Sequence, residues 1–462
     1  MSTDHVTIRT GAYADSVALL QVSRDVQRVP GVATAQVAMA TPLNVEVLTG
    51  LGFAVPPGTT PNDLVVAIRL EDGGDLDQAI AAVDVGLTPT RSAGAAREAE
   101  PRRTTGSALA DSPGLVLVSV PGASAFVEAM DALDAGCDVM VFSDNVPVAQ
   151  EVSLKRTAAE RGLLVMGPDC GTAVVGGVGL GFANATVPGP VGIVAASGTG
   201  CQQVLALLDH AGVGVTSALG VGGRDLSADV GGTSTIEALR RLDADDTVEL
   251  VLVVSKPPAP EVAARIEEFA ATLATPVELA LLGPGQPDLT EAVERILAGL
   301  DVQVPDWPVV GHAEPGGGGP VRGLFVGGTT CQEAQLVVES LDPRDHTFVD
   351  FGDDAYTQGR AHPMIDPTLR LEEVRRAASD PGTGALLLDV VLGHGAEPDP
   401  AALLAPAITD AAVPVVVTVV GTRLDPQDRD RQVRVLAEAG AEVHLSNAAA
   451  ARRAVELARG TR

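Results

Sequence analysis

Residues 191–208 read V-G-I-V-A-A-S-G-T-G-C-Q-Q-V-L-A-L-L, an apolar run followed by a loop of small residues and then by apolar residues at helical spacing. This pattern predicts a buried strand, a tight loop and a helix. Residues 321–338, V-R-G-L-F-V-G-G-T-T-C-Q-E-A-Q-L-V-V, align with the first stretch without a gap. The chain therefore contains the same predicted strand–loop–helix unit twice.

The similarity between the two halves continues beyond this unit. Two further pairs of segments match, 249–260 with 385–400 and 275–283 with 413–421. Strand, loop and helix recur in the same order over three successive strands, which is unexpected by chance. We therefore predict two tandem flavodoxin-like domains, residues 189–301 and 321–462. A Gly- and Pro-rich linker at 302–320 joins them.

Three segments precede the repeats. Residues 114–188 alternate apolar strands with helices, which predicts a Rossmann-like domain with a parallel sheet covered on both faces. Residues 1–88 have the order β-α-β-β-α, which predicts a small α+β domain of ferredoxin-like type. Residues 89–113 lack periodicity and are rich in Ala, Arg, Ser, Thr, Pro and Gly, which is typical of a linker. The predicted fold class is α/β.

Composition narrows the class of function. The 462 residues carry a formal net charge of −29, so we expect no nucleic-acid partner. No apolar run reaches the length of about 18–20 residues that crosses a membrane, and the first residues do not resemble a signal peptide. We therefore expect a cytoplasmic protein without a membrane partner. The four cysteines form no C-x-x-C pair, which predicts reduced thiols and no metal site.

The two Gly/Thr loops predict an anion site. Backbone N–H groups at a helix start have no partner within the helix, and the helix dipole adds positive charge there, so such an end binds phosphate or carboxylate. The alternative is ordinary helix capping by Ser and Thr. If both helix starts face one anion, they form a single site for phosphate or an acyl-phosphate. The predicted phosphate-binding residues are Ser197, Gly198, Thr199, Gly200, Gly328, Thr329 and Thr330.

Several motifs resemble a known family. The stretches L-V-L-V-S-V-P (115–121), V-F-S-D-N-V-P (141–147) and M-G-P-D-C-G-T (166–172) resemble the α subunit of succinyl-CoA synthetase, as do residues 191–200. The motifs S-D-N-V, G-P-D-C-G-T, G-V-G-G-R-D-L-S (220–227) and G-R-A-H-P-M-I-D-P (359–367) are similar to FdrA proteins over nearly the whole chain. The resemblance implies that the Rossmann-like domain is of CoA-ligase type. It also implies that each of the two Gly/Thr loops supplies one side of a phosphate site.

The resemblance implies an enzyme subunit that handles an acyl-phosphate and a small carboxylate with companion subunits. The implied chemistry is either an acyl-CoA synthetase-like ligase reaction or oxamate carbamoyl transfer from carbamoyl phosphate. The alternatives are a non-catalytic regulatory or assembly subunit that keeps an anion site, and a nicotinamide oxidoreductase, for which the expected G-x-G-x-x-G is missing. A homodimer stays open.

The chain departs from the family at three places that bear on cofactors. The loop that carries the phosphorylated histidine in the α subunit corresponds here to G-P-G-Q-P-D-L-T (283–290), which has no histidine. CoA stays open as a ligand, although the segment before residue 114 lacks the glycine-rich loop that holds it in the family. No ATP-grasp region is present, so ATP would act only through a partner.

A polar segment at 353–370 supplies the candidate side chains. It should form a loop at the carboxyl end of a strand at 347–351, where open α/β sheets place ligands. We predict catalytic roles for His362, Asp354 and Arg360. The predicted substrate-binding residues are Asp366, Arg370, Asp169, Cys170 and His394, with Asp169 and Cys170 lining a pocket left from an ancestral CoA site. The alternative is a salt-bridged surface loop, and we expect Cys201 and Cys331 to pack beneath the two loops.

Overall fold

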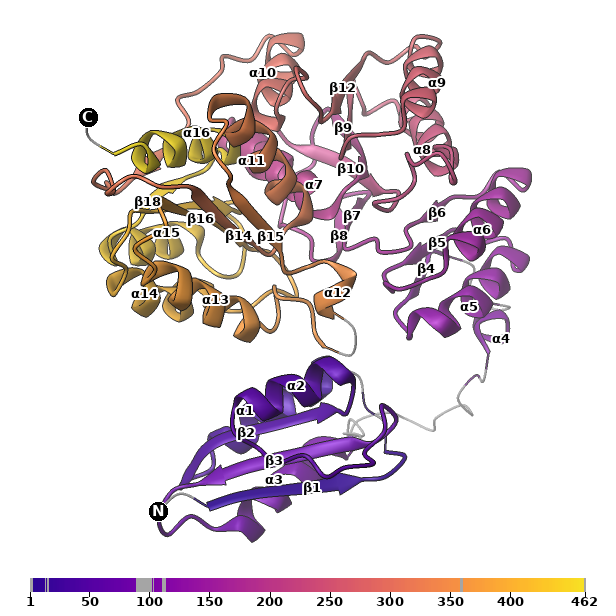
Figure 1. The fold of residues 1–462 in the computed structure, drawn as a ribbon. Coiled ribbons are helices and arrows are strands. Elements are labelled where there is room, and N and C mark those ends of the chain that lie inside the picture. The colour runs from indigo at the N-terminus through magenta and orange to yellow at the C-terminus, as the bar shows by residue number, and fades with distance from the viewer. Residues whose placement is uncertain are drawn as a thin grey trace. The chain divides into compact units, whose positions relative to one another are not determined.

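The computed structural model describes residues 3–12, 14, 16–88, 102, 104–109, 114–357 and 360–460, so most of the predicted linker at 89–113 lies outside the described residues. The chain forms two compact units (Figure 1). Unit 1 contains residues Met1–Pro101 and Asp353–Pro367, and unit 2 contains Arg102–Gly352 and Thr368–Arg462. The polar segment after residue 352 therefore belongs to unit 1, although the strands on either side of it in the sequence belong to unit 2.

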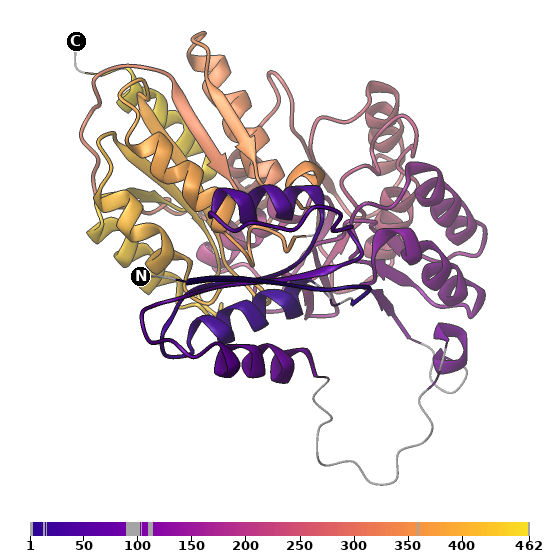
Figure 2. The same ribbon diagram turned by 60° about the horizontal axis from the view of Figure 1, so that its bottom comes forward.

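Unit 1 is a three-stranded antiparallel sheet with helices on both faces. Its elements are β1 (Thr3–Arg9), α1 (Ser16–Gln27), β2 (Val32–Met39), α2 (Pro42–Gly50), β3 (Leu64–Leu70) and α3 (Leu76–Leu87), with the strand order β1-β3-β2. Side chains alternate along the central strand β3. Leu64, Val66 and Ile68 pack with α1 and α3, whereas Val65 and Ala67 pack with α2 on the other face. The ribbon shows helices on both faces of this sheet (Figure 2).

Helix α2 was not predicted, so the predicted order β-α-β-β-α is incomplete. The local signals for this helix were nevertheless present. Thr41 caps it by accepting a hydrogen bond from the Asn44 N–H, and Pro42 stands at its first position, where proline is tolerated. The segment 353–367 adds the four-residue helix α12 (Asp354–Thr357) to unit 1.

Unit 2 begins with the short helix α4 (Thr105–Leu109) and a three-stranded parallel sheet. Its elements alternate as predicted, and they are β4 (Val116–Val118), α5 (Gly122–Asp134), β5 (Val139–Val141), α6 (Val148–Glu160) and β6 (Val165–Met166), with the order β4-β5-β6. Helices α5 and α6 pack on one face of this sheet, and all residues of β5 and β6 are buried. Leu117 of β4 is exposed, so the predicted cover on both faces is incomplete at this edge.

The first repeat forms a six-stranded sheet with the order β12-β11-β9-β10-β7-β8. The hairpin β7 (Thr172–Val175) and β8 (Val178–Gly181) adds an antiparallel edge. The repeat proper consists of β9 (Val191–Ala196), α7 (Gly198–His210), β10 (Val215–Gly220), α8 (Thr233–Asp243), β11 (Leu250–Ser255), α9 (Pro260–Ala270), β12 (Val277–Leu281) and α10 (Leu289–Gly299). Every residue of β9 and β11 is buried.

The second repeat forms another six-stranded sheet, with the order β13-β18-β17-β16-β14-β15. Its edge strand β13 (Val309–Val310) comes from the segment predicted as a linker. The remaining elements are β14 (Val321–Phe325), α11 (Gly328–Leu341), β15 (Thr347–Asp350), α13 (Thr368–Ala378), β16 (Ala385–Val391), α14 (Pro400–Thr409), β17 (Val415–Val420), α15 (Arg429–Glu438), β18 (Glu442–His444) and α16 (Asn447–Ala458).

The two repeats share one strand order. Counted from the first strand of each repeat, it is 2-1-3-4 in the first and 2-1-3-4-5 in the second, an order found in doubly wound sheets. Helix α7 of the first repeat contacts α11 of the second, and α10 contacts α16 (Figure 1). The equivalent helices α7 and α11 therefore lie side by side between the sheets. Within the described residues, no helix combines the length and apolar character needed to cross a bilayer.

Candidate functional site

The start of α7 follows directly from the buried strand β9. Ser197 caps the helix, and its Oγ accepts a hydrogen bond of 2.9 Å from the Gly200 N–H. The serine is extended, with φ −169°, so the chain turns from strand to helix at this residue. This arrangement agrees with the capping role considered for the loop, and it leaves the first N–H groups of α7 at the carboxyl end of the sheet.

The start of α11 is held differently, by a carboxylate in the sheet. Gly327 precedes the helix and has no side chain to cap it. Instead, Asp389 on β16 accepts hydrogen bonds from the N–H groups of Val326 (2.8 Å) and Gly327 (3.0 Å), and from Thr330 Oγ1 (2.8 Å). Thr330 is fully buried and its hydroxyl faces Asp389. Its side chain therefore positions the loop.

Arg370 completes this buried group. Its guanidinium donates to the carbonyl oxygens of Leu324 (2.9 Å) and Asp389 (2.6 Å), and it forms an ion pair of 3.2 Å with the Asp389 carboxylate. Burial raises the pKa of Asp389, against the opposing effect of Arg370 and of the N–H donors. Arg370, predicted to bind substrate, therefore has its hydrogen bonds directed to the frame of the α11 loop.

The two helix starts meet. Ser197 Oγ donates a hydrogen bond of 2.5 Å to Thr329 Oγ1, and the Thr329 N–H lies 3.4 Å from Thr199 Oγ1. A Cβ atom on Gly200 would lie 2.9 Å from Thr329 Cγ2, and one on Gly327 would lie 2.7 Å from Thr199 Cγ2. Only glycine at these two positions lets the loops approach so closely. We call this contact the paired helix starts.

The paired helix starts carry concentrated positive potential. Within the described part of the chain, the N–H groups of Gly198, Thr199, Gly328 and Thr330 donate no hydrogen bond. Gly198 and Gly328 are also only half-buried, whereas the residues that follow them are buried. Two helix dipoles end here, each equivalent to about half a positive charge. This arrangement is suited to an anion.

Each of the helices α7 and α11 forms a hydrogen bond with the other repeat. Gln203 on α7 donates a hydrogen bond of 2.9 Å to the carbonyl oxygen of Leu445, which lies just before α16. The equivalent residue on α11, Glu333, accepts a hydrogen bond of 2.7 Å from the Leu289 N–H at the start of α10. Glu333 also accepts 2.7 Å from Asn447 Nδ2, and burial raises its pKa to about 7. These contacts fix the two helices relative to each other.

A second buried network joins the β4–β6 sheet to the first repeat. Lys155 Nζ on α6 lies 2.8 Å from each of Glu151 Oε1, Asp225 Oδ1 and the Val221 carbonyl oxygen. Asp225 belongs to the motif G-V-G-G-R-D-L-S and also accepts from the N–H and hydroxyl of Thr235. The motif therefore has a structural use in this protein, as the connection between two sheets.

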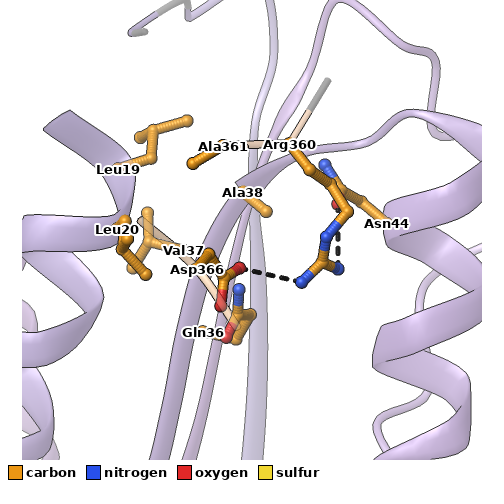
Figure 3. A pocket seen from close by; sticks show the side chains of 9 residues that line it. All are labelled: Leu19, Leu20, Gln36, Val37, Ala38, Asn44, Arg360, Ala361 and Asp366. Carbon is orange, nitrogen blue, oxygen red and sulfur yellow. Dashed lines mark hydrogen bonds and ion pairs between the residues drawn. The ribbon is translucent and has the colours of Figure 1, made fainter. Parts of the chain in front are cut away.

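The predicted catalytic residues lie in unit 1. Asp354 is exposed at the start of α12, and Arg360 pairs with Asp366 at 2.9 Å and lies 3.4 Å from Asn44 Oδ1 (Figure 3). Arg360, Asp366 and Asn44 line a small pocket against α1 and β2, with a volume of about 290 Å³ that includes open solvent. Burial lowers the pKa of His362 to about 4, and its Nδ1 accepts from the Met364 N–H. Gly359 of the same motif lies outside the described residues.

The other predicted residues are spread over unit 2. Asp169 is exposed with a left-handed φ of 57°, whereas Cys170 beside it is buried. His394 is exposed, and its backbone N–H donates to the Ala183 carbonyl oxygen. It follows β16, as Lys256 follows β11, so both lie near the carboxyl edges of their sheets as expected.

The three buried thiols near the loops are not activated. Burial raises the pKa of Cys170, Cys201 and Cys331, to about 12 for Cys201. Cys201 and Cys331 pack beneath the two loops, as expected, and the helix starts do not offset the effect of burial on them.

Sequence reasoning missed Asp389 and Glu333. The signal for Asp389 was a single acidic residue inside the apolar strand A-L-L-L-D-V-V. Glu333 stands where the other repeat has Gln203, which the alignment of the loops contained but did not explain. Within the described residues, no group of three or more His, Cys, Asp and Glu side chains is arranged to hold a metal ion.

Within the described residues, the β4–β6 sheet lacks the glycine-rich loop that the CoA-ligase resemblance leads us to expect for CoA. Helices α5 and α6 begin after Pro121 and Pro147, and neither has a side-chain cap. A Cβ atom on Gly122 would overlap the Asp144 carbonyl oxygen, so this glycine serves packing between the loops. No glycine-rich loop follows β4 or β5 in the described residues. We therefore derive no step through CoA.

Two family models match the chain. One, described as CoA-ligase, matches residues 324–457, which form most of the second repeat. The other, described as the AllF heavy metal-associated domain, matches residues 1–103, where the chain has no cysteine. The protein is thus a mixed α/β protein with a CoA-ligase domain and a small N-terminal domain of AllF type.

Known proteins resemble longer parts of the chain. Subunit alpha 2 of the ADP-forming succinate–CoA ligase of Archaeoglobus fulgidus is 30% identical over 241 residues, covering 49% of this chain and 76% of that subunit. These matches define the class, a protein of the CoA-ligase type. Within this class, the chain belongs to the family of YahF from Escherichia coli K12, an uncharacterized protein that is 35% identical over 489 aligned positions, covering 94% of this chain and 95% of YahF.

Among solved structures, the dinucleotide-forming acetyl-coenzyme A synthetase 1 of Ca. Korarchaeum cryptofilum, in complex with phosphate and ADP, covers 76% of this chain and 85% of its own. The sequence identity is 15% and the TM-score is 0.31, so this likeness carries no argument about the site.

Proposed function

We propose that the chain is a ligase-type enzyme subunit that binds phosphate or an acyl-phosphate at the paired helix starts. The observation that carries the proposal is the hydrogen bond of 2.5 Å between Ser197 Oγ and Thr329 Oγ1, which joins the starts of two equivalent helices. The proposed phosphate-binding residues are Ser197, Gly198, Thr199, Gly200, Gly328, Thr329 and Thr330, with Thr330 acting through the position of its loop.

The chemistry follows from the donors. N–H groups fixed by a folded loop stabilise negative charge without having to reorganise when charge develops. In an acyl-phosphate, the phosphate leaves with additional negative charge as the acyl group passes to an acceptor. The paired helix starts would stabilise this leaving group. The loop between β12 and α10 has no histidine, which favours a non-covalent route over a phosphohistidine.

The small carboxylate, the acceptor and the partners belong to the same proposal. Because the Archaeoglobus fulgidus relative is named as a subunit, we propose that a companion subunit supplies any nucleotide chemistry. Oxamate carbamoyl transfer and an acyl-CoA synthetase-like reaction are the two forms to be tested. The catalytic roles of His362, Asp354 and Arg360 and the substrate-binding roles of Asp366, Asp169, Cys170 and His394 stay predictions.

The finer fold names are also part of the proposal. The strand orders 2-1-3-4 and 2-1-3-4-5 support two flavodoxin-like repeats of one ancestral unit. The order β1-β3-β2, with α1 and α3 on the same face, supports a ferredoxin-like relationship for unit 1.

The test is phosphate release from two acyl-phosphates, carbamoyl phosphate with oxamate and acetyl phosphate with CoA, each with and without co-purified companion proteins. Ser197→Ala and Thr329→Val should each lower the rate by about tenfold, because each removes a hydroxyl that joins the helix starts. Ser340→Ala, at an exposed position near the end of α11, is the matched control.

Two results would count against the proposal. Full activity in the Ser197→Ala/Thr329→Val double variant would exclude the paired helix starts as the reaction site. Tight phosphate binding without turnover of either acyl-phosphate, even with companions, would favour the regulatory alternative.

A further inference from the structure

Thr172 presents a buried hydroxyl without a partner among the described residues. The residue is 2% exposed, begins β7, and its Oγ1 forms no hydrogen bond within the described part of the chain. This oxygen lies 3.5 Å from the position that a Cβ atom of Gly198 would occupy, at the first residue of α7. A buried hydroxyl without a partner is destabilising, so a ligand that accepts its hydrogen bond beside the helix start would be favoured.

Lys256 brings a positive charge to the other helix start. Lys155 and Lys256 are the two lysines of the chain, and Lys155 is enclosed in the network with Glu151 and Asp225. Lys256 is half-buried, and its side chain forms no hydrogen bond or ion pair with any described residue. Its Nζ lies 2.7 Å from the position that a Cβ atom of Gly328 would occupy.

Lys256 adds its positive charge to that of the α11 helix start. A helix start carries partial positive charge, so a cation placed there is repelled. Asp350 offsets part of this repulsion, because its Oδ2 lies beside the same Cβ position of Gly328. Lys256 comes from the first repeat and Gly328 from the second. The first repeat therefore supplies a positive charge to the helix start of the second.

We propose that Thr172 and Lys256 are direct ligands of a phosphoryl group held non-covalently at the paired helix starts. This inference rests on the proposed function and names two further ligands and the class of substrate. Thr172 donates its hydroxyl hydrogen to a phosphoryl oxygen beside Gly198. Lys256 pairs with the anion beside Gly328. The site then takes a dianion, either inorganic phosphate or the phosphate end of an acyl-phosphate, by charge and hydrogen bonding alone.

Calorimetric titration of the full chain with inorganic phosphate tests the proposal. Lys256→Met should weaken binding by about 10- to 100-fold and Thr172→Val by about 3- to 10-fold, because a hydrogen bond to a charged group contributes more than one between neutral groups. Lys256→Arg should restore most of the affinity. Asp350→Asn should tighten binding, since it removes a negative charge beside the anion.

Matched controls are available in the same unit. Thr383 is another buried threonine whose Oγ1 has no hydrogen bond within the described residues, and it precedes the amino end of β16, so Thr383→Val should leave phosphate binding unchanged. Arg434→Met removes an exposed positive charge from α15 and should also have no effect.

A second measurement needs no variant. An amine-acetylating reagent should modify Lys256 in the native protein, whereas Lys155, at 1% exposure, should stay unmodified as an internal control. Saturating phosphate should slow modification of Lys256 in peptide mass spectra. Unchanged labelling with phosphate bound, or wild-type affinity in both Lys256→Met and Thr172→Val, would overturn this inference and leave the proposed function standing. If wild-type protein binds neither phosphate nor acyl-phosphate, the proposed function itself fails.

Discussion

Glu333→Gln is the substitution whose effect can be worked out most fully. Burial raises the pKa of this carboxyl from 4.5 to about 7. Below pH 4.5 it is protonated in both the folded and the unfolded chain, and above pH 7 it is ionised in both. Folding is therefore penalised as pH rises through this window, by about 3 kcal/mol at about 1.4 kcal/mol per pKa unit.

Glutamine cannot ionise, so the variant should lose this pH dependence. The free energy of unfolding of Glu333→Gln, minus that of the wild type, should rise by about 3 kcal/mol from pH 4.5 to above pH 7. The pH-independent part of the difference in unfolding free energy is not part of this test, because the new amide group faces Asn447 Nδ2, which is also a donor. The pH slope alone tests the argument.

Urea unfolding followed by tryptophan fluorescence measures this slope. Trp307 is the single tryptophan, and its indole donates to Glu294 on α10, the helix whose start Glu333 holds. Its signal therefore reports on the contact between the repeats. Glu339→Gln, at an exposed site on α11, is the control and should show no such slope. A difference between Glu333→Gln and wild type that stays constant across the pH range would refute the reasoning.

Three further outcomes are expected. Asp389→Ala should lower the free energy of unfolding by about 3–5 kcal/mol in urea, because it leaves Arg370 and the α11 loop without their buried partner, and a loss below about 1 kcal/mol would contradict this role. Lys155→Met should cost a similar amount, because the buried Asp225 loses its counter-ion and Glu151 keeps only Arg224, and wild-type stability in this variant would argue against the network. In native protein the thiols of Cys201 and Cys331 should resist an aromatic disulfide reagent at neutral pH, because burial raises their pKa. Both should react once urea unfolds the chain. Rapid reaction of either thiol before unfolding would show that it is accessible.

Much of the fold was predictable because its strands and helices carry local signals. The apolar runs before Ser197 and Gly327 predicted β9 and β14, and the small residues predicted where α7 and α11 begin. The β7–β8 hairpin was not predicted, although Gly176 and Gly177 adopt positive φ at its turn. The assignment of 353–367 to unit 1 had no local signal, because it depends on contacts with residues more than 300 positions away, such as Arg360 with Asn44.

The candidate site was predictable only in part, for the same reason. The sequence identified two similar loops, and their similarity suggested a common anion. It did not show that Thr172 and Lys256 approach those loops, because each comes from a different strand end, although Thr172 ends the motif M-G-P-D-C-G-T. Arg370 shows the converse difficulty. Its place in a polar segment suggested substrate binding, whereas its partner Asp389 is reached only through the folded sheet.

The unequal pair Gln203 and Glu333 shows what duplication within a single polypeptide permits. In an assembly of two identical subunits, every mutation occurs twice, so symmetry-related positions stay chemically the same. Here each copy has its own codon at this position and has diverged independently, to an amide in one half and a titratable acid in the other. Burial raises the pKa of Glu333 to about 7, whereas Gln203 has no ionisable group, so the two halves of the core differ in their charge as pH changes.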